Sequence, residues 1–254
     1  MGATREYLQQ DQPDGVPPLA LTGERTLPDV PEENYWYRRH LVVYEWIAAR
    51  CAGLDVVDMA CGEGYGTGVL ARSAKHVTGV DANPEAFEHA RARYGGPTVD
   101  FARDLVDSYS ERCDAVTFLQ TIEHVEDDAG VLRHFKSMLR PGGTVYVSTP
   151  NLLTLAPPGA EKSDNPWHLR EYRPEEFRAL CESVFDEVEL LGLFHVRKLR
   201  VHELALKLGW DTVHKRLGVT GRFYDWFTPA IAASDFALRD GPLDSALDLV
   251  AVLR

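Results

Sequence analysis

A glycine-rich segment, VVDMACGEGYGTG at residues 56–68, is the part of the sequence best suited to hold a ligand. Gly62, Gly64 and Gly66 would give a tight turn there, and a backbone without a β-carbon lets a ligand approach closely. Asp81 follows nineteen residues after Gly62. A carboxylate at that point can accept hydrogen bonds from both hydroxyls of a ribose. The pattern therefore predicts a site for a ligand that contains a nucleoside.

Two classes of ligand could use such a loop, a dinucleotide and an S-adenosyl compound. The dinucleotide pattern is GxGxxG. When the pattern begins at Gly62 its last position is Thr67, and when it begins at Gly64 that position is Val69, so both registers fail. Asp58, just before the loop, would repel a pyrophosphate, whereas a cationic amino-acid group could interact with it directly or through water. These features favour the S-adenosyl compound.

The elements that must position this loop form an alternating series of short apolar runs and helical patterns. Such a series predicts parallel βαβ units with right-handed crossovers, and hence a doubly wound, seven-stranded, mostly parallel α/β sheet. In a sheet of this kind a ligand lies beyond the carboxyl ends of the strands. The predicted strands are 54–60, 76–81, 98–102, 113–119, 143–150, 185–194 and 246–253, and the predicted helices are 33–50, 66–74, 83–94, 128–139 and 174–183.

The chain divides into three parts. Residues 1–20 are polar and contain three prolines, and we expect a disordered or loosely attached arm. Residues 21–53 form a leader and a helix with apolar positions three and four residues apart. Residues 54–254 form the main domain, in which residues 195–245 are a helical, aromatic-rich insert before the last strand. This insert would either cap the substrate or make a homodimer contact, because aromatic residues are enriched in both.

Several segments, in the expected order, resemble the class I S-adenosylmethionine-dependent methyltransferases of the type 11/12-like group. Residues 56–64 resemble their first motif, hydrophobic-D-x-G-C-G-x-G, with Ala60 where a glycine is usual. Asp81 matches the acid that binds the ribose, and residues 103–105 match the segment beside the adenine. Residues 118–127 and 139–151 match the later strands.

The resemblance implies a Rossmann-like fold, an enzyme that transfers methyl groups, and S-adenosylmethionine as its cofactor. The cofactor-binding residues that it implies are Tyr44, Asp58, Ala60, Cys61, Gly62, Gly64, Asp81, Ala82, Arg103, Asp104, Leu105 and Gln120.

The leader, GERTLP followed by YRRHLVVYEW, resembles a branch of this family that is linked to sugar and cell-surface glycan modification. In that branch an Arg-His pair followed by a tyrosine approaches the cofactor, and here these residues would be Arg39, His40 and Tyr44. The alternative is a helix that docks by its apolar face and leaves Arg39 in solvent. The resemblance makes O-methylation of a hydroxyl on a sugar, oligosaccharide or glycolipid precursor the leading hypothesis.

Transfer of a methyl group to a hydroxyl requires that the hydroxyl lose its proton, so a base or a metal is needed. A histidine suits the role of base near neutral pH. His124, beside Glu123, and His168 both follow strand ends on the ligand side of the predicted sheet. We therefore expect Glu123, His124 and His168 to be the catalytic residues. The alternative for each histidine is a structural role.

The same three residues also resemble a metal site. The pattern Glu-x-x-Glu-His, followed by a later histidine, occurs in methyltransferases that act on RNA 3′ ends and in some quinone O-methyltransferases. That pattern would make Glu123, His124 and His168 ligands of a divalent metal such as Mg²⁺, held against two adjacent hydroxyls. Gln120, a poorer ligand, replaces the first carboxylate of the pattern. A metal-free site with a histidine base is the alternative.

Charge and composition argue against other classes of partner. The formal net charge of −12 disfavours a nucleic acid held mainly through its phosphates. No apolar run is long enough for a membrane helix, and the N-terminus lacks the features of a signal peptide, so we expect a cytoplasmic protein without a membrane span.

Two alternatives to the sugar acceptor remain open. A small aromatic or polyketide-like metabolite would use the aromatic residues at 223–236 as an apolar pocket, whereas a sugar site would present Asp, Glu, Arg and Trp at its mouth. The other alternative is a non-catalytic partner protein that binds S-adenosylmethionine.

Overall fold

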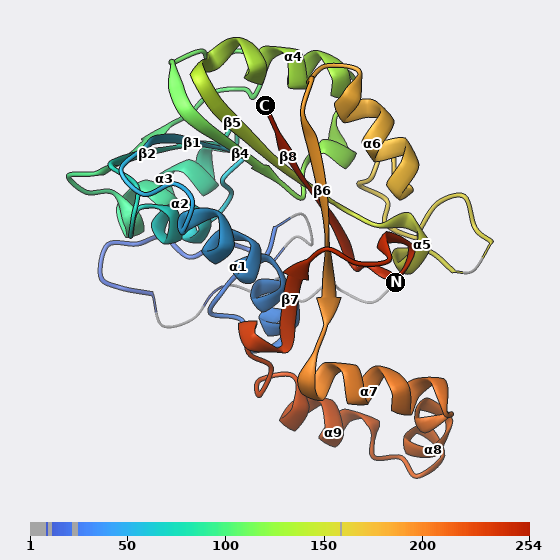
Figure 1. Ribbon diagram of the computed structural model, residues 1–254. Coiled ribbons are helices and arrows are strands. Elements are labelled where there is room, and N and C mark those ends of the chain that lie inside the picture. Colours follow the sequence, from blue (N-terminus) through green and yellow to red (C-terminus); the bar gives the residue numbers. More distant parts are fainter. Residues whose placement is uncertain (1–8, 10–11, 22–24, 158) are drawn as a thin grey trace.

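The computed structural model describes residues 9, 12–21, 25–157 and 159–254. Its centre is an eight-stranded mixed sheet with the strand order β3-β2-β1-β4-β5-β8-β6-β7 (Figure 1). The strands from β3 to β5 pair in parallel, while β8 runs antiparallel between β5 and β6, and β7 pairs antiparallel to β6 at one edge. The strands are β1 Asp55–Met59, β2 His76–Val80, β3 Val99–Ala102, β4 Cys113–Leu119, β5 Leu139–Pro150, β6 Val188–His195, β7 Phe236–Arg239 and β8 Asp248–Leu253.

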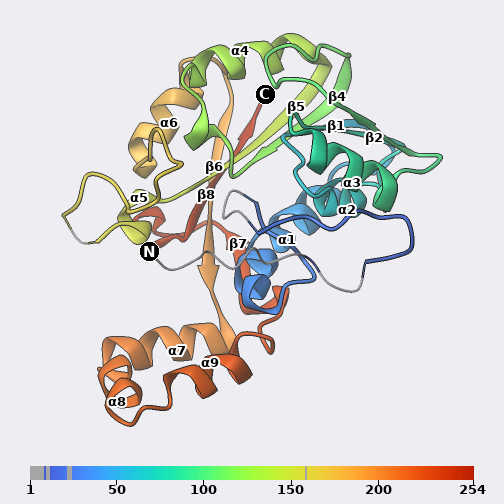
Figure 2. The ribbon, with the colours of Figure 1, turned by 180° about the vertical axis from the view of Figure 1, so that it is seen from behind.

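Helices cover both faces of the sheet (Figures 1 and 2). Helices α1 and α2 pack on one face with Val56 of β1, and α4 and α6 pack on the other with Val57. Successive residues of a strand point to opposite faces, so this sheet has an apolar core on each side. The α-helices are α1 Asn34–Ala48, α2 Tyr65–Leu70, α3 Pro84–Tyr94, α4 Asp128–Met138, α5 Leu152–Leu155, α6 Pro174–Glu182, α7 Arg197–Lys207, α8 Trp210–Arg216 and α9 Thr220–Phe227.

Short 3₁₀ turns lie between these elements. They are η1 Pro31–Glu33, η2 Ile122–His124, η3 Ala233–Asp235 and η4 Leu243–Ser245. Helix α3 begins where the sequence indicates, because the Asn83 side chain accepts hydrogen bonds from the backbone N–H groups of Glu85 and Ala86, and Pro84 takes the first helical position.

The doubly wound α/β fold is confirmed, but the sheet has eight strands and not the predicted seven. The additional strand, β7, is four residues long and pairs only with β6. So short a run carries no alternation of its own, and its strand form depends on the partner. Strand β5 also begins at Leu139 rather than at 143, because Leu139 pairs with Cys113 before the register shifts between Cys113 and Ala115.

The described part of the N-terminal arm contacts the main domain. Leu19, Leu27 and Val30 form a small buried cluster. The carbonyl of Pro17 lies 2.6 Å from Nδ1 of His89 in α3. Residues 1–8 and 10–11 lie outside the described residues, so the loose attachment expected for residues 1–20 stays a prediction.

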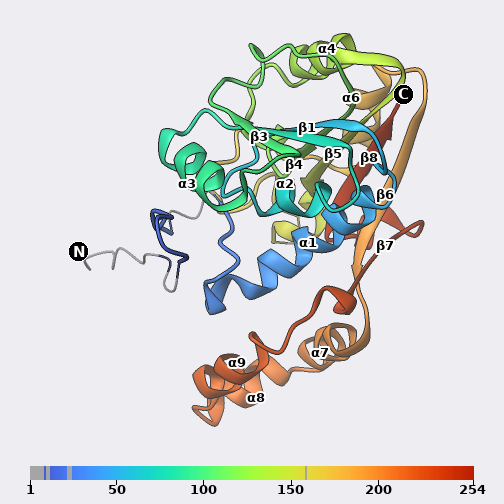
Figure 3. The ribbon, with the colours of Figure 1, turned by 90° about the vertical axis from the view of Figure 1, so that its left-hand side faces the viewer.

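Helices α7, α8 and α9 form a layer of their own beyond the end of β6 (Figures 1 and 3). Because β6 and β5 are both antiparallel to β8, β6 ends at the same edge of the sheet as β1 and β4. Asn34 of α1 fastens this layer by donating from Nδ2 to the carbonyls of Thr228 at 2.8 Å and Ile231 at 2.9 Å. Among the described residues, no helix is both long enough and apolar enough to cross a membrane.

Candidate active site

One cavity of about 660 Å³ lies at the carboxyl ends of β1, β2 and β4. It joins the glycine-rich loop to the histidine cluster, so a cofactor and an acceptor could lie side by side in it. The predicted residues that line it are Tyr44, Ala60, Cys61, Gly62, Asp81, Gln120, Glu123, His124 and His168. The other predicted residues, Asp58, Gly64, Ala82, Arg103, Asp104 and Leu105, are outside its described lining.

Three residues of the glycine-rich loop have left-handed backbone conformations, with positive φ angles. Ala60 has a φ of 55°, Gly62 one of 56° and Gly64 one of 93°. The left-handed region costs a residue with a β-carbon about 1–2 kcal/mol, which accounts for the glycine that the family usually has at the position of Ala60. Gly66 has a different reason to be glycine, since a β-carbon there would lie 2.1 Å from Cζ of Tyr44.

Asp81 is fixed against the loop by its two carboxylate oxygens. Oδ2 accepts a hydrogen bond from the backbone N–H of Gly62 at 2.8 Å, and Oδ1 accepts one from Asn83 at 2.9 Å. Each oxygen keeps a second lone pair, and the residue lines the cavity. This arrangement fits the predicted contact with the ribose hydroxyls.

Asp58 has its carboxylate turned into the protein. Oδ1 accepts from Thr117 Oγ1 at 2.6 Å and from Tyr44 OH at 3.3 Å, and Oδ2 accepts from Thr67 Oγ1 at 2.7 Å. Burial raises the pKa of Asp58 to about 6. In this structure the carboxylate therefore ties α1, α2 and β4 to the loop, rather than facing the cavity as the sequence led us to expect.

The segment predicted to flank the adenine follows β3 at the same edge of the sheet. Arg103 and Leu105 are exposed, and Asp104 accepts a hydrogen bond from the backbone of Leu105 through Oδ1.

Gly64 caps the N-terminus of α2, where a β-carbon would lie 2.7 Å from Cβ of Ala90. Its side of the loop packs on α3 and so shapes the cavity indirectly.

The leader helix places neighbouring residues in different surroundings. His40 lines the cavity, and burial lowers its pKa to about 4, so its ring is neutral at physiological pH. Arg39 is only 5% exposed and forms a two-pronged ion pair with Asp248 of β8, with Nε–Oδ2 at 2.7 Å and Nη2–Oδ1 at 2.5 Å. Arg39 thus neither lines the cavity, as the leader resemblance implies, nor lies in solvent.

Replacement of Arg39 by alanine should lower the free energy of unfolding by about 3–5 kcal/mol, because the buried carboxylate of Asp248 would lose its cation. Denaturation by urea measures this loss. The control is Arg50→Ala just beyond the end of the same helix, where the exposed side chain donates to the carbonyl of Trp46 and lies over its ring, and a change within about 0.5 kcal/mol is expected. Equal effects of the two substitutions would refute a structural role for Arg39.

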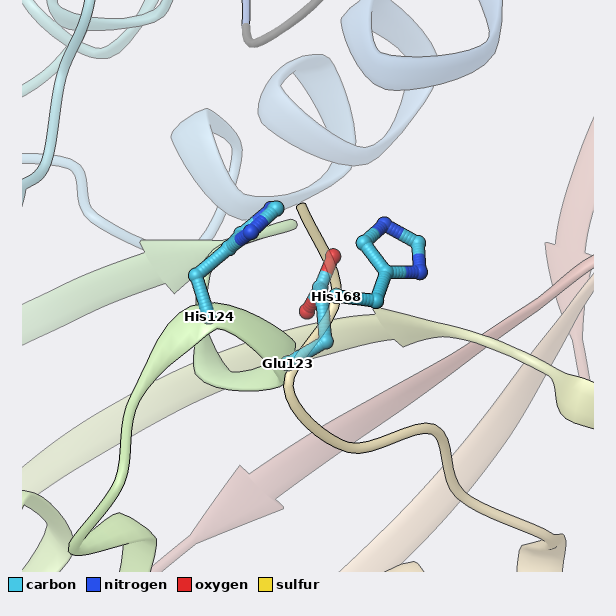
Figure 4. A group of neighbouring side chains, drawn as sticks. All are labelled: Glu123, His124 and His168. Atoms are coloured by element: carbon cyan, nitrogen blue, oxygen red, sulfur yellow. The ribbon is translucent and has the colours of Figure 1, made fainter. Parts of the chain in front are cut away.

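Glu123, His124 and His168 meet as predicted, and their ligand atoms lie within 4.8 Å of one another (Figure 4). The two imidazole centroids are 5.0 Å apart. The loop that carries His168 is docked on the turn that carries Glu123, since the Glu123 carbonyl accepts from the backbone N–H of Leu169 at 2.8 Å. Residues that are 45 positions apart in the chain are thereby held at one wall of the cavity.

Hydrogen bonds orient both imidazoles. The carbonyl of Trp167 lies 2.8 Å from His124 Nδ1, so this nitrogen carries the proton and Nε2 is the basic one. His168 Nδ1 is 2.6 Å from the buried Glu171 carboxylate, and its Nε2 is 2.9 Å from the amide nitrogen of Asn165. Burial alone would raise the pKa of Glu171, but hydrogen bonds from Ser163 and His168 outweigh it and lower the pKa of that carboxyl.

Glu123 differs from an ordinary surface carboxylate. It is 1% exposed, and Thr149 Oγ1 donates to its Oε2 at 3.0 Å. Burial raises the pKa of Glu123 to about 8. At neutral pH the group is therefore mostly protonated and can donate a hydrogen bond into the cavity.

Replacement of Glu123 by glutamine should make the fold less sensitive to pH. A carboxyl whose pKa is raised from 4.5 to about 8 stabilises the fold fully below pH 4.5, and this contribution is lost as the pH rises through about 8. Glu123→Gln should therefore gain a few kcal/mol relative to the wild type between about pH 5 and pH 8. Thermal unfolding across this range tests it, with the exposed Glu88→Gln as a control; a constant difference from wild type would disprove the raised pKa.

The metal hypothesis fits this hydrogen-bonding less well than the base hypothesis. His168 uses both ring nitrogens within the protein, and the Glu123 carboxyl is mostly neutral. His124 alone has the arrangement of a metal-binding histidine, with Nδ1 bonded to a backbone carbonyl. The Gln120 amide, where the pattern needs a carboxylate, donates from Nε2 to Ser148 Oγ at 3.0 Å. A cation would need most of these groups to change partner or protonation, so we derive no step through a metal.

Several lining residues were not predicted from the sequence. Two are tryptophans at the cavity, Trp36 in α1 and Trp167 beside His168, which are 40% and 48% exposed. Both lie within four residues of a histidine that the sequence singled out, and this proximity was the signal that could have identified them. The others are Arg25, Thr26, Glu33, Glu63, Tyr65, Leu119, Thr121, Pro150, Leu155 and Asn165.

Comparisons with known proteins agree with this geometry. A family model described as a methyltransferase domain matches residues 32–204. A probable S-adenosylmethionine-dependent methyltransferase of Mycolicibacterium smegmatis is 39% identical, over 94% of this chain and 97% of that protein. A ubiquinone biosynthesis O-methyltransferase of Aromatoleum aromaticum is 29% identical, over 63% of this chain and 77% of that protein.

The fold is also that of solved methyltransferases. The crystal structure of a methyltransferase from Thermotoga maritima, named as a possible histamine N-methyltransferase, matches with a TM-score of 0.57 at 17% identity, over 87% of this chain and 93% of that one. A cavity floored by the glycine-rich loop and walled by Asp81 suits the cofactor of such enzymes. The chain belongs to the class I S-adenosylmethionine-dependent methyltransferases and is an enzyme of that family.

Proposed function

We propose that this enzyme methylates a hydroxyl on a sugar, an oligosaccharide or a glycolipid precursor. S-adenosylmethionine supplies an electrophilic methyl group on a positively charged sulfur. The loop from Ala60 to Gly62, with Tyr44 and Asp81, would hold it at one side of the cavity. The acceptor then lies on the other side, towards His124 and His168.

The observation that carries the sugar proposal is a set of residues that line the cavity. Two partly exposed tryptophans, Trp36 and Trp167, offer flat apolar surfaces to the C–H faces of a sugar ring. Arg25, Glu33 and Asn165 add the charged and amide groups that bind hydroxyls. Trp, Arg and Glu are three of the four residue types expected at the mouth of a sugar site, and this supports the proposal.

His124 is the group best placed to take the proton of the acceptor hydroxyl. Its Nδ1–H is held by the Trp167 carbonyl, which leaves Nε2 as the nitrogen that accepts the proton. As the O–H bond breaks, the proton would go to Nε2, and the electron pair on the oxygen would form the new bond to the methyl carbon. The bond from that carbon to the positively charged sulfur would break at the same time and leave its electron pair on the sulfur, which becomes neutral. His168, whose ring is held between Glu171 and Asn165, forms the adjoining wall and limits the space for the acceptor.

The aromatic residues at 223–236, which a small aromatic acceptor was expected to use as a pocket, do not line the described cavity. No residue of 195–245 is among the described residues that line the cavity. The rings of α9 instead stack on one another and on α7, as in the pairs Phe223–Phe227 and His202–Phe223. The name of the Aromatoleum relative still makes a phenolic acceptor the strongest competitor.

The test is transfer of isotopically labelled methyl from S-adenosylmethionine to separated pools of saccharides and of phenolic metabolites. We expect label in the saccharide pool, in a product that resists mild base as an ether does. We also expect the same rate with and without EDTA, because no step needs a metal. Label only in the phenolic pool would overturn the sugar proposal, and loss of activity on chelation that Mg²⁺ restores would revive the metal site.

A further inference from the structure

The layer formed by α7, α8 and α9 (residues 197–227, the α7–α9 unit) is rich in exposed large apolar side chains. Seven of the twelve exposed large apolar side chains among the described residues belong to its 31 residues. The unit does not need them for its own core, which is built from stacked rings such as His202, Phe223 and Phe227. The exposed residues are Val201, Leu204, Leu208, Val213, Leu217, Val219 and Trp226.

On α7 the exposed apolar residues form a stripe. Val201, Leu204 and Leu208 are spaced three and four residues apart, so they lie on one face of the helix. Arg200 and Lys207 neighbour this stripe and share a single carboxylate, that of Glu203. A face that mixes apolar and basic side chains is typical of helices that lie in a membrane interface.

The far end of the α7–α9 unit also carries exposed apolar and basic side chains. Leu208, at the end of α7, is 89% exposed, and Leu217, just after α8, is 66% exposed. Figures 1 and 2 place α8 at the end of the unit that is farthest from the sheet. Lys215 and Arg216 lie beside Leu217 and are also exposed.

The charge of the unit is opposite to that of the whole chain. Residues 197–227 carry a formal charge of +4, although the chain as a whole carries −12. A symmetric dimer through this unit would bring two positive surfaces together, which disfavours a second copy as its partner. The charged residues are the basic Arg197, Lys198, Arg200, Lys207, Lys215, Arg216 and Arg222 and the acidic Glu203, Asp211 and Asp225.

We infer that the α7–α9 unit docks this enzyme on an anionic lipid surface, with the end formed by Leu208 and α8 entering the interface. The basic side chains bind the anionic headgroups, and the exposed leucines enter the acyl boundary. The inference is independent of the acceptor. It bears on catalysis because Asn34 fastens the end of α9 to α1, and Trp36 of the same helix lines the cavity. Since β6 ends at the same edge of the sheet as β1 and β4, a docked enzyme would turn the edge that carries the cavity towards the membrane.

The test is co-sedimentation of the full chain with vesicles of phosphatidylcholine, with and without phosphatidylglycerol. We expect binding only to the vesicles that contain phosphatidylglycerol, and weaker binding at high salt. Leu208→Glu and Leu217→Glu should each weaken this binding at least about tenfold. The matched control is Leu153→Glu, an exposed leucine of α5 on another part of the surface, which should bind as the wild type does.

Thermal unfolding and titration with S-adenosylmethionine establish that each variant is folded, and neither should change. Failure of the folded wild type to bind either kind of vesicle would overturn the inference. So would a dimer, seen by sedimentation velocity, that Leu208→Glu abolishes, because the apolar end would then be an interface between copies of the chain.

Discussion

Replacement of Asp81 by alanine should weaken the binding of S-adenosylmethionine by about 100-fold or more. Two hydrogen bonds from the ribose hydroxyls to a charged acceptor would be lost, and bonds of this kind contribute about 1.5–3 kcal/mol each. The substitution also removes the acceptor of the Gly62 N–H, which fixes the glycine-rich loop. Isothermal titration calorimetry of the folded variant measures the loss.

The matched control for Asp81 is Asp100→Ala. Asp100 lies on β3, its side chain is 74% exposed, and its partner is the imidazole of His76 on the surface. Cofactor affinity should stay at the wild-type level in this variant. If Asp81→Ala binds S-adenosylmethionine as well as Asp100→Ala does, the assignment of the ribose site is wrong.

Replacement of His124 by alanine should lower kcat by about 10²–10⁴-fold, which is the usual contribution of a positioned acid or base. The affinity for S-adenosylmethionine should change little, because the loop and Asp81 hold the cofactor without the imidazole. The rate of labelled methyl transfer, measured at saturating cofactor, tests this loss.

Related variants separate the roles of the two histidines. His168→Ala should also slow transfer, while Glu171→Gln should have a smaller effect and raise KM, since Glu171 acts through the orientation of the His168 ring and of Ser163. His76→Ala, at an imidazole that pairs with Asp100 on the surface, is the control and should keep full turnover. Full turnover in both His124→Ala and His168→Ala would show that neither is the base.

The fold was largely predictable because its signals are local. Strands β1, β2 and β4 are short, largely apolar runs, and each was located within about a residue. Strand β7 had no such signal, since its four residues form a strand only by pairing with β6. The early start of β5 likewise depends on the partner strand, through the pairing of Leu139 with Cys113.

The site was predictable where its residues follow strands, and less so where tertiary packing decides the direction of a side chain. Asp81, His124 and His168 line the cavity as predicted. The sequence could not show that the Asp58 carboxylate is enclosed by Thr67, Thr117 and Tyr44, because these come from three other elements. Nor could it show that Arg39 finds Asp248, which is 209 positions away in the chain.

The most direct measurement is a crystal structure of the enzyme with S-adenosylhomocysteine. We predict that the ribose hydroxyls lie within hydrogen-bond distance of Asp81, and that the sulfur faces the space between His124 and the tryptophans Trp36 and Trp167. S-adenosylhomocysteine bound away from Asp81, or with its sulfur remote from His124, would contradict the arrangement of cofactor and acceptor in one cavity.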